Sequence, residues 1–305
     1  MNILIMIKNN QFLMKKYGEL IELYYCILSL ISPRLNTKVR YQHVFHKKLN
    51  LDTPKSFNEK LLYLKLNDYI KNPLVIQCAD KYAVREYVSN CGYSHLLNEL
   101  YGVYENTKDI AWDNLPQQFV LKWNFGAGMN IICSDKSKLN ERETIEKLKK
   151  WGGWRKAKSW LLASEMQYKY APKKIVCEKF LQNADGSESI PDYKVYCFNG
   201  EPQAIFVMHD RGKVIKTEFF DTQWNPLQNS EKYKEALIHS KKPECLNEML
   251  DASRAFSKPF PFVRCDFFVV DGKLYFGELT FTPAGGLYTS QTKINGKDMS
   301  DYLSI

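Results

Sequence analysis

Several signatures that identify common protein classes are missing from this 305-residue chain. It has no C-x-x-C motif and no cluster of cysteine with histidine, which argues against a structural zinc site. G-x-S-x-G and H-E-x-x-H are absent, and the five histidines stand in no recognisable nucleophile context, so neither a serine hydrolase nor a zinc protease is indicated. A Walker A loop, a complete dinucleotide fingerprint and an internal repeat are also missing, which excludes those nucleotide-binding and repeat architectures.

Long hydrophobic runs are missing too. The apolar stretch Leu20–Ile31 is interrupted by a glutamate, is too short to span a bilayer and has no small-residue cleavage site. We expect a core or docking helix here; the alternative is an interfacial helix in peripheral contact with a membrane, helped by Lys15, Lys16, Arg34 and Lys38. Eight cysteines, scattered singly and partly inside apolar runs, are typical of buried free thiols in a reducing cytoplasm. We therefore expect a cytoplasmic protein, peripheral at the inner face of the membrane if the alternative holds.

The composition that is present indicates a globular protein with anionic partners. Charged residues make up 25% and aromatic residues 14%, and the length suits two or three subdomains. A formal charge of +9 suits nucleotides, acidic glycans, nucleic acid or a membrane surface without choosing among them. Basic and aromatic residues interleave over residues 141–158, as on surfaces that stack on nucleic-acid bases, but no nucleic-acid-binding motif accompanies them. A solvated helix ending at Gly152-Gly153 and a mobile lid segment are the better interpretation, and we expect no nucleic-acid partner.

Caps and breakers outline the helices. The pattern over residues 10–35 predicts a helix, and we expect Ser32-Pro33 to end it. Ser56 and Glu59 have the spacing of a capping box and predict the start of another helix. An amphipathic helix over residues 243–257 is predicted before the last strands.

A glycine turn between two apolar strands is the first candidate ligand-binding feature. Residues 118–133 read as strand, Gly-x-Gly turn and strand, with Lys122 in the first strand and Gly126 and Gly128 in the turn. A glycine hairpin with a strand lysine resembles the flap that covers ATP phosphates in kinase-like sites, because glycine allows a ligand to approach the backbone closely. The alternative is a tight hairpin with a solvated lysine.

A second hairpin carries paired charges. The strands 193–198 and 202–208 flank an Asn-Gly turn, the combination that favours a two-residue hairpin loop. Asp192 and Lys194 are two residues apart at its mouth, so we expect both side chains on one face.

The last hairpin carries charges in strands that otherwise belong in a core. Arg264, Asp266 and Glu278 are residue types that are rarely buried unless they are paired or bound to a metal. They can form an ordinary ion pair, or a divalent-metal site on a rigid hairpin. A two-residue loop in regular register places Asp266 and Glu278 on opposite faces, so the metal site needs a three-residue loop or a bulge. We favour the three-residue loop 270–272, which puts Arg264 opposite Glu278 and gathers Thr280 on the same face.

Phosphoryl transfer from ATP needs hard oxygen ligands for Mg²⁺, cations for the phosphates and a lid that excludes water. The chain supplies each part. The oxygen ligands are Asp266 and Glu278, the cations are Lys122, Lys194 and Arg264, and the Gly126–Gly128 turn offers backbone N–H groups.

These features occur in the order of a known family. The matching segments are Pro54–Lys60, Ala79–Arg85, Leu115-Pro116 with Phe119–Lys122, Glu178–Leu181, Asp192–Lys194 with Cys197–Gly200, Arg264–Asp266 and Phe276–Pro283. Over residues 50–290 the chain resembles the TupA-like ATP-grasp proteins of bacterial cell-surface polysaccharide biosynthesis. The resemblance implies an α+β ATP-grasp fold, in which two antiparallel-sheet subdomains clasp ATP after a helical or α/β N-terminal region. We expect residues 1–105 to form that region, 106–181 the lid subdomain with the glycine hairpin, and 182–305 the metal-binding subdomain.

The resemblance also implies roles for individual residues. The nucleotide would be held by the glycine flap, Lys122, Lys194 and an adenine hinge made of Glu178, Lys179, Phe180 and Leu181. Mg²⁺, or Mn²⁺ in its place, would be held by Asp266, Glu278 and Thr280. Arg264 and Lys194 would act at the reacting groups, Arg264 facing the transferred phosphate or the acyl substrate.

The resemblance suggests an ATP-dependent carboxylate–amine ligase that works through an acyl phosphate and releases ADP. Its partners would be ATP, a uronic acid or other anionic glycan, and an amine from an amino acid or peptide. An ATP-dependent sugar kinase, a glycosyltransferase of the same pathway and a glycan-binding protein with a degenerate ATP site are the alternatives. The glycosyltransferase reading leaves Lys122 and the glycine flap without a role.

Overall fold

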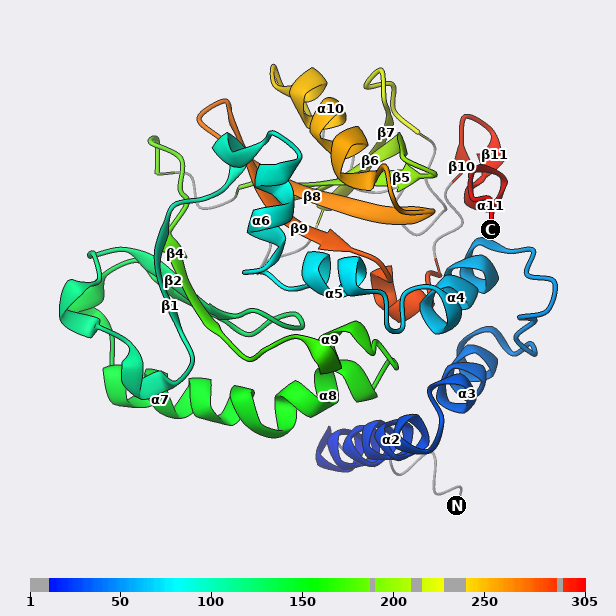
Figure 1. The fold of residues 1–305 in the computed structure, drawn as a ribbon, viewed down its shortest axis with the longest axis horizontal. Helices are drawn as coiled ribbons and strands as arrows, with labels where there is room; N and C mark the ends of the chain where they lie inside the picture. Colours follow the sequence, from blue (N-terminus) through cyan, green and yellow to red (C-terminus); the bar gives the residue numbers. More distant parts are fainter. Residues whose placement is uncertain (1–10, 187–189, 210–215, 228–239, 290–292) are drawn as a thin grey trace.

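The computed structural model describes residues 11–186, 190–209, 216–227, 240–289 and 293–305. Figure 1 shows a four-stranded sheet and a five-stranded sheet on either side of the molecule, with helices between and around them. The helices are α2 (Gln11–Ile31), α3 (Pro33–Phe45), α4 (Phe57–Asn67), α5 (Pro73–Ala79), α6 (Val84–Asn90), α7 (Glu141–Lys150), α8 (Lys156–Leu161), α9 (Gln167–Tyr170), α10 (Leu246–Ser257) and α11 (Met299–Tyr302). Short 3-10 turns are η1 (Ser94–Leu96), η2 (Thr107–Asp109), η3 (Trp112–Asn114), η4 (Lys136–Lys138) and η7 (Pro283–Gly286).

The N-terminal helices follow their caps. Helix α2 ends at Ile31, as Ser32-Pro33 predicts, but a further helix that the sequence reading did not include, α3, begins at once. Pro33 is its first residue, and the Ser32 hydroxyl accepts a hydrogen bond from the Leu35 N–H (3.2 Å). The capping box of Ser56 and Glu59 at the start of α4 is confirmed, with each side chain accepting from the other's backbone N–H. Within the described residues no helix is both long and apolar enough to cross a membrane.

The smaller sheet, here called the lid sheet, is antiparallel with strand order β1-β4-β2-β3. Its strands are β1 (Leu100–Tyr104), β2 (Phe119–Trp123), β3 (Asn130–Cys133) and β4 (Ile175–Lys179). Its core side chains pack with Leu148 of α7 and Trp151. The predicted division of the chain at residue 105 stays a prediction; strand β1 precedes that position and pairs with β4.

Regular helix beside the lid sheet is interrupted at the glycine pair, as predicted, but helical structure resumes beyond it. It continues from α7 through the segment η5 (Trp151–Arg155) into α8, with a kink at Gly153 (φ −90°, ψ −121°). Gly152 allows the close contact, because a Cβ there would lie 2.6 Å from the Trp123 ring. The segment thereby brings Arg155 and Lys158 to the cavity described below.

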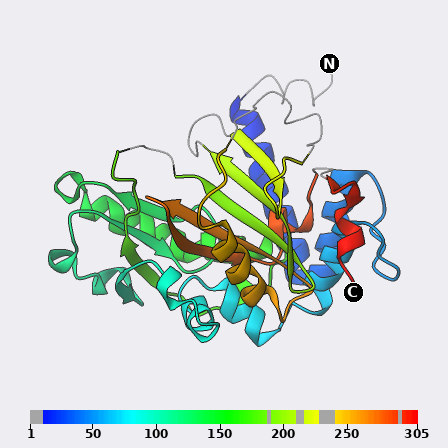
Figure 2. The same cartoon turned by 90° about the horizontal axis from the view of Figure 1, so that it is seen from above.

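The larger sheet, here called the site sheet, is also antiparallel, with strand order β7-β6-β5-β8-β9. Its strands are β5 (Asp192–Phe198), β6 (Glu201–His209), β7 (Lys216–Asp221), β8 (Phe262–Val270) and β9 (Lys273–Thr280). The hairpin β5–β6 turns at Asn199-Gly200, both with positive φ, as predicted. A small ribbon of β10 (Lys293–Ile294) and β11 (Lys297–Asp298) lies beside it near the C-terminus (Figures 1 and 2).

The two faces of the site sheet differ completely. One face is apolar and packs on α10, α5 and α6 in the main core, which includes Val195, Ile205, Cys265, Phe267 and Leu279. Because side chains alternate along a strand, the intervening residues face the other way, and these carry the charges and aromatic rings discussed below. The fold class is α+β with two antiparallel sheets, as predicted.

Candidate active site

A bulge, and not a long loop, sets the register of the last hairpin. The favoured three-residue loop is wrong: Val270 pairs with Lys273, and Asp271 and Gly272 form a two-residue turn with φ of 49° and 76°. The register then shifts at Gly277, so that Asp266 lies opposite Glu278 and not diagonal to it. A Cβ on Gly277 would lie 2.9 Å from the Asp266 carbonyl oxygen, which explains why glycine stands there. The bulge was the stated alternative to a longer loop, and it brings the predicted charges together.

Four of the predicted residues form a buried charge cluster on the site sheet. The Arg264 guanidinium donates through Nε and Nη2 to both oxygens of Asp266, each at 2.6 Å. Lys194 Nζ lies 2.8 Å from Asp266 Oδ2 and 2.8 Å from Asp192 Oδ2, so Asp192 and Lys194 share a face as predicted. The ion pair considered from the sequence is therefore present, but as part of a network of two cations and two acids.

The protonation of this cluster follows from its contacts. Burial by itself would raise the pKa of the Asp266 carboxyl, but Arg264 and Lys194 outweigh burial and hold that pKa below its usual value. Burial would likewise lower the pKa of Arg264, but the Asp266 carboxylate outweighs it and raises the pKa further. Asp266 and Arg264 therefore both keep their charges at neutral pH.

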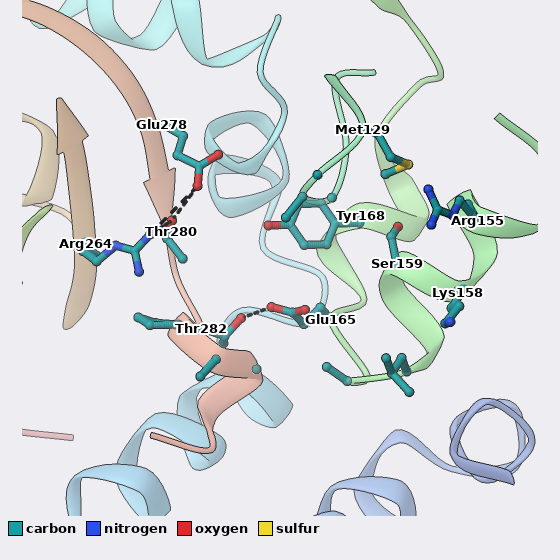
Figure 3. A pocket seen from close by; sticks show the side chains of 18 residues that line it. Met129, Arg155, Lys158, Ser159, Glu165, Tyr168, Arg264, Glu278, Thr280 and Thr282 are labelled. Carbon is teal, nitrogen blue, oxygen red and sulfur yellow. Dashed lines mark hydrogen bonds and ion pairs between the residues drawn. The ribbon is translucent and has the colours of Figure 1, made fainter. Parts of the chain in front are cut away.

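A cavity of about 580 Å³ opens between the site sheet and the lid. Figure 3 shows Arg264, Glu278 and Thr280 on one side of it, and Met129, Arg155, Lys158 and Ser159 on the other. Glu278 Oε1 accepts from the Thr280 hydroxyl (3.3 Å) and lies 3.9 Å from Arg264 Nη2. The cavity thus has oxygen ligands on one side and cations on the opposite side.

The predicted glycine turn forms part of this cavity. Gly126 and Gly128 both line it and both have positive φ (63° and 72°). A Cβ on Gly126 would lie 3.0 Å from the Ser159 Cβ, so the turn is held against α8 by a contact that only glycine allows.

Lys81 connects the glycine turn to the acid side of the cavity, and the sequence reading did not single it out as a site residue. Its Nζ donates to the Gly126 carbonyl (2.6 Å) and lies 3.5 Å from Glu278 Oε2. Its position is fixed by Asn124, which is fully buried and bonds the Lys81 N–H, the Asp80 carboxylate and the Lys174 N–H. Lys81 belongs to the family-matching segment Ala79–Arg85, which could have pointed to it. The sequence of that segment does not show which of its side chains reaches the cavity.

Lys122 and Glu178 pair in the lid sheet and do not line this cavity. Their Nζ and Oε2 atoms are 2.6 Å apart, and Arg85 Nη1 lies 3.6 Å from the other oxygen of Glu178. The remaining hinge residues are further away: Lys179 and Phe180 line a separate hollow with Tyr101, and Lys179 donates its N–H to the Glu99 carbonyl (3.0 Å). Leu181 follows β4 and is half-buried.

A second buried charge cluster supports the cavity from below. Lys65 Nζ donates to the carbonyls of Ala163 (2.8 Å) and Gly285 (3.1 Å), and burial lowers its pKa to about 7. Glu165, which lines the cavity, accepts from the Thr282 hydroxyl, and burial raises its pKa (Figure 3). These contacts tie α4 and the α8–α9 connection to the turn η7, in which Ala284 has a φ of 52°.

The donor set fits a divalent cation of the Mg²⁺ type. Asp266, Glu278 and Thr280 offer two carboxylates and a hydroxyl on adjacent strands, and Mg²⁺ is commonly bound by one or two carboxylates together with substrate phosphates. Among the described residues there is no group of three or more His, Cys, Asp or Glu that could hold a metal by itself. A cation here would also share Asp266 with Arg264 and Lys194.

Comparison with solved structures finds distant likenesses at low sequence identity. D-alanine–D-alanine ligase from Bacillus anthracis complexed with ATP is 16% identical with a TM-score of 0.39, the match covering 67% of this chain and 55% of that chain. L-amino acid ligase from Bacillus licheniformis is 15% identical with a TM-score of 0.38, covering 68% of this chain and 41% of that one. N5-carboxyaminoimidazole synthase from Aspergillus clavatus is 10% identical with a TM-score of 0.42, covering 68% and 45%. The chain thus spans about half the length of these proteins.

No curated protein matches the chain. The model of the TupA-like ATP-grasp family matches residues 59–302, which include both sheets, the glycine turn and both charge clusters. The resemblance drawn from the motifs is therefore confirmed, and the chain belongs to the TupA-like ATP-grasp family.

Proposed function

We propose that this protein is an ATP-dependent carboxylate–amine ligase. The observation that carries the proposal is the cavity between the sheets, in which a glycine turn and two cations, Arg155 and Lys158, face Arg264, Glu278 and Thr280. Triphosphate chemistry needs this combination, because charge must be neutralised from several sides while water is excluded. Family membership supports an ATP-grasp site, and the acid, the amine and a role in surface-polysaccharide synthesis are part of the proposal.

The reaction has two steps. A carboxylate oxygen of the substrate attacks the γ-phosphorus of ATP, the bond from that phosphorus to the bridging oxygen breaks, and ADP leaves with the electron pair. The amine nitrogen then attacks the acyl carbon, phosphate leaves, and the amine loses a proton to water. No covalent nucleophile of the protein is required, so positioning and charge neutralisation carry the catalysis.

Each predicted residue has a task in this proposal. Arg264 and Lys194 stabilise the negative charge at the transferred phosphoryl group, and Gly126 and Gly128 allow the phosphates close to the flap. Lys122 contacts the nucleotide, with adenine along Glu178, Lys179, Phe180 and Leu181. Asp266, Glu278 and Thr280 would hold Mg²⁺, which supplies Lewis-acid stabilisation of the phosphates when bound. We add Lys81, since it joins the flap to Glu278.

Product mass separates the ligase from its alternatives. The full chain is incubated with ATP, Mg²⁺, a uronic acid and a panel of amines, and ADP, phosphate and product mass are followed. A product heavier by the amine minus water, formed with one ADP, is expected for the ligase. A product heavier by one phosphoryl group would establish a sugar kinase instead, and turnover of a nucleotide-sugar without ADP release would remove ATP from the reaction.

We also propose that α2 rests on an anionic membrane surface. Leu13, Tyr17, Leu20, Tyr24, Ile27 and Ile31 recur every three or four residues on its outer side and are 37–70% exposed. The opposite side is buried, with Cys26 and Ser29 against the protein. Exposed cations lie on α2, α3 and the following loop: Lys15, Lys16, Arg34, Lys38, Lys47 and Lys48. The same stretch holds two exposed acids, Glu19 and Asp52. An apolar stripe beside cations matches anionic lipid headgroups over an acyl layer.

Vesicle sedimentation tests this surface. The protein should sediment with phosphatidylglycerol vesicles and much less with phosphatidylcholine vesicles, and Leu20→Glu with Ile27→Glu should abolish sedimentation. Ile132→Glu, an equally exposed residue on β3, is the control and should leave sedimentation unchanged. A double variant that still sediments, or a wild type whose mass doubles with concentration unless the stripe is mutated, would show that lipid is not the occupant.

A further inference from the structure

A second hollow lies on the same face of the site sheet, beyond the charge cluster. It has a volume of about 420 Å³ and is lined by side chains of β5, β6, β7 and β8 together with η7. Arg264, Pro283 and Ala284 line both this hollow and the larger cavity. The two spaces therefore meet at the Arg264 guanidinium.

Pairing across the sheet explains how its lining changes from strand to strand. Lys194 pairs with Asp266 on one side and with Phe206 on the other, and Phe206 pairs with Phe219. Across this row of paired residues, β9 and β8 carry acids, β5 carries Lys194, and β6 and β7 carry aromatic rings. The Phe206 and Phe219 rings are 4.5 Å apart between centroids and form a continuous apolar surface in the hollow.

One polar group in this hollow has no partner. Thr217 is 93% buried (7% exposed), it lines the hollow, and its hydroxyl makes no hydrogen bond to any described residue. An unpaired buried hydroxyl costs free energy, so a position that keeps one is a candidate for a ligand contact.

Arg264 has a nitrogen to spare at the same boundary. Its Nε and Nη2 are engaged by Asp266 and Thr280, while Nη1 has no partner among the residues that the structure describes. A carboxylate is the anion whose flat geometry best matches a free guanidinium edge.

We propose that this second hollow binds the carboxylic-acid substrate, an acid built on a single ring. Its carboxylate lies at Arg264, its ring on the Phe206–Phe219 surface, and a ring hydroxyl at Thr217. The inference rests on the proposed function, and it assigns the two substrates to opposite sides of Arg264: the ATP phosphates in the larger cavity, the acid in the aromatic hollow. A sugar-ring acid and a plain carbocyclic acid share the carboxylate and the ring, and differ at Thr217.

Hydroxylamine as the amine makes the test independent of the natural acceptor. Its nitrogen attacks the acyl carbon of the acyl phosphate and displaces phosphate, giving a hydroxamate. ADP release and hydroxamate are measured with glucuronate, cyclohexanecarboxylate, acetate and glucose, and ATP·Mg²⁺ binding is measured separately by calorimetry. Both ring acids should support turnover, with acetate at least tenfold poorer in kcat/KM and glucose inert.

Two variants locate the acid. Phe206→Ala should raise the KM for both ring acids about tenfold without changing the Kd for ATP, whereas Ile132→Ala, an exposed apolar residue of the lid sheet, should change neither. Thr217→Val should raise the KM for glucuronate about five- to tenfold and leave that for cyclohexanecarboxylate unchanged, since one hydrogen bond is lost. Its thermal stability should not fall, because the hydroxyl it removes is unpaired, and this separates a ligand contact from a structural role.

The outcomes separate the two proposals. Acid-dependent ADP release that neither variant alters, or acetate as good as the ring acids, would overturn the placement of the acid and leave the ligase intact. A sugar-ring acid that depends on Thr217 identifies that class of substrate; a carbocyclic acid that turns over better and ignores Thr217 identifies the other. ATP binding without acid-dependent ADP release from any ring acid would overturn both proposals.

Discussion

The lid sheet and the site sheet each carry a cluster of opposite charges with nearly equal internal distances. Lys122 and Glu178 are 2.6 Å apart in the lid, and Lys194 and Asp266 are 2.8 Å apart in the site sheet. The side chains differ in enclosure: Lys122 is 18% exposed and Lys194 4%. If Lys122 is lost, Arg85 still lies beside Glu178 in the lid, whereas loss of Lys194 leaves the more enclosed cluster of the site sheet with two acids and one cation. Distance alone therefore does not say what an ion pair does for a protein.

The largest effect on stability is expected at the enclosed cluster. Lys194→Met leaves Asp192 facing Asp266 with one fewer cation, and should lower the free energy of unfolding by about 4 kcal/mol, the cost of breaking a buried pair. Urea denaturation of this variant beside Lys122→Met measures the contrast. Equal losses in the two variants would contradict the distinction between the clusters.

At the edge of the same cluster, charge should matter for turnover more than for folding. The Glu278 side chain is 41% exposed, so Glu278→Gln removes the carboxylate charge without burying an unpaired group. We expect ADP release to fall by about 100-fold or more, the scale of losing a group that stabilises transition-state charge. Thermal denaturation should be nearly unchanged, and retained turnover would refute the assignment of Glu278 as a metal ligand.

The bulge at Gly277 sets the register of Asp266 and Glu278, and adding one methyl group at this position should disrupt it. Gly277→Ala brings a Cβ to 2.9 Å from the Asp266 carbonyl oxygen, so the backbone must shift, at a cost of about 2 kcal/mol. Turnover should fall as well, because Asp266 and Glu278 no longer lie opposite each other. Gly18→Ala in α2, where nothing lies within 4 Å, is the matched control and should be neutral or stabilising. An equally neutral Gly277→Ala would show that the bulge tolerates a side chain.

Loss of the lid cation Lys122 should affect nucleotide binding more than stability. Lys122→Gln leaves Glu178 beside Arg85, so the loss of stability should be about 1 kcal/mol or less. The KM for ATP should rise about tenfold, corresponding to one charge-assisted contact of about 1.4 kcal/mol. Steady-state kinetics at varied ATP checks this, and an unchanged KM with a large loss of stability would mean that Lys122 serves the fold alone.

The smallest effect is the pH dependence that Asp266 contributes. Its pKa is lower in the folded protein than in the unfolded chain, so the unfolded chain binds more protons as the pH falls. The stability it contributes is complete above the ordinary carboxyl pKa of about 3.9 and is lost as the pH falls through the lowered folded value. In acid denaturation, Asp266→Asn should show a shallower decline below about pH 4 by up to 1 kcal/mol per pH unit. Parallel curves for the two proteins would contradict this assignment.

Local chemistry made much of the fold predictable. The capping box at Ser56 and the Asn199-Gly200 turn were predicted correctly because each depends on neighbouring residues alone. Alternation placed Asp192 and Lys194 on one face for the same reason. The Gly277 bulge depends on how closely another strand approaches, which no local pattern reports.

The same distinction separates the predicted from the missed parts of the site. Charges within otherwise apolar strands pointed to Arg264, Asp266 and Glu278, and the structure places them together. The glycine pair predicted a break before Arg155 and Lys158, but nothing in their own sequence shows that the segment after it carries them to the cavity. The unpaired hydroxyl of Thr217 is likewise visible only once burial and partners are known.

The alternation of the site sheet also limits which changes of length the gene can accept. Lys194 and Tyr196 of β5 line the second hollow and position 192 shares their face, while positions 193, 195 and 197 face the main core. One inserted or deleted residue within β5 would exchange these sets, turning Val195 toward the ligands and Lys194 into the hydrophobic interior. The turn at Asn199-Gly200 lies outside this constraint, so natural length variation in this hairpin should gather there and leave the strands at constant length.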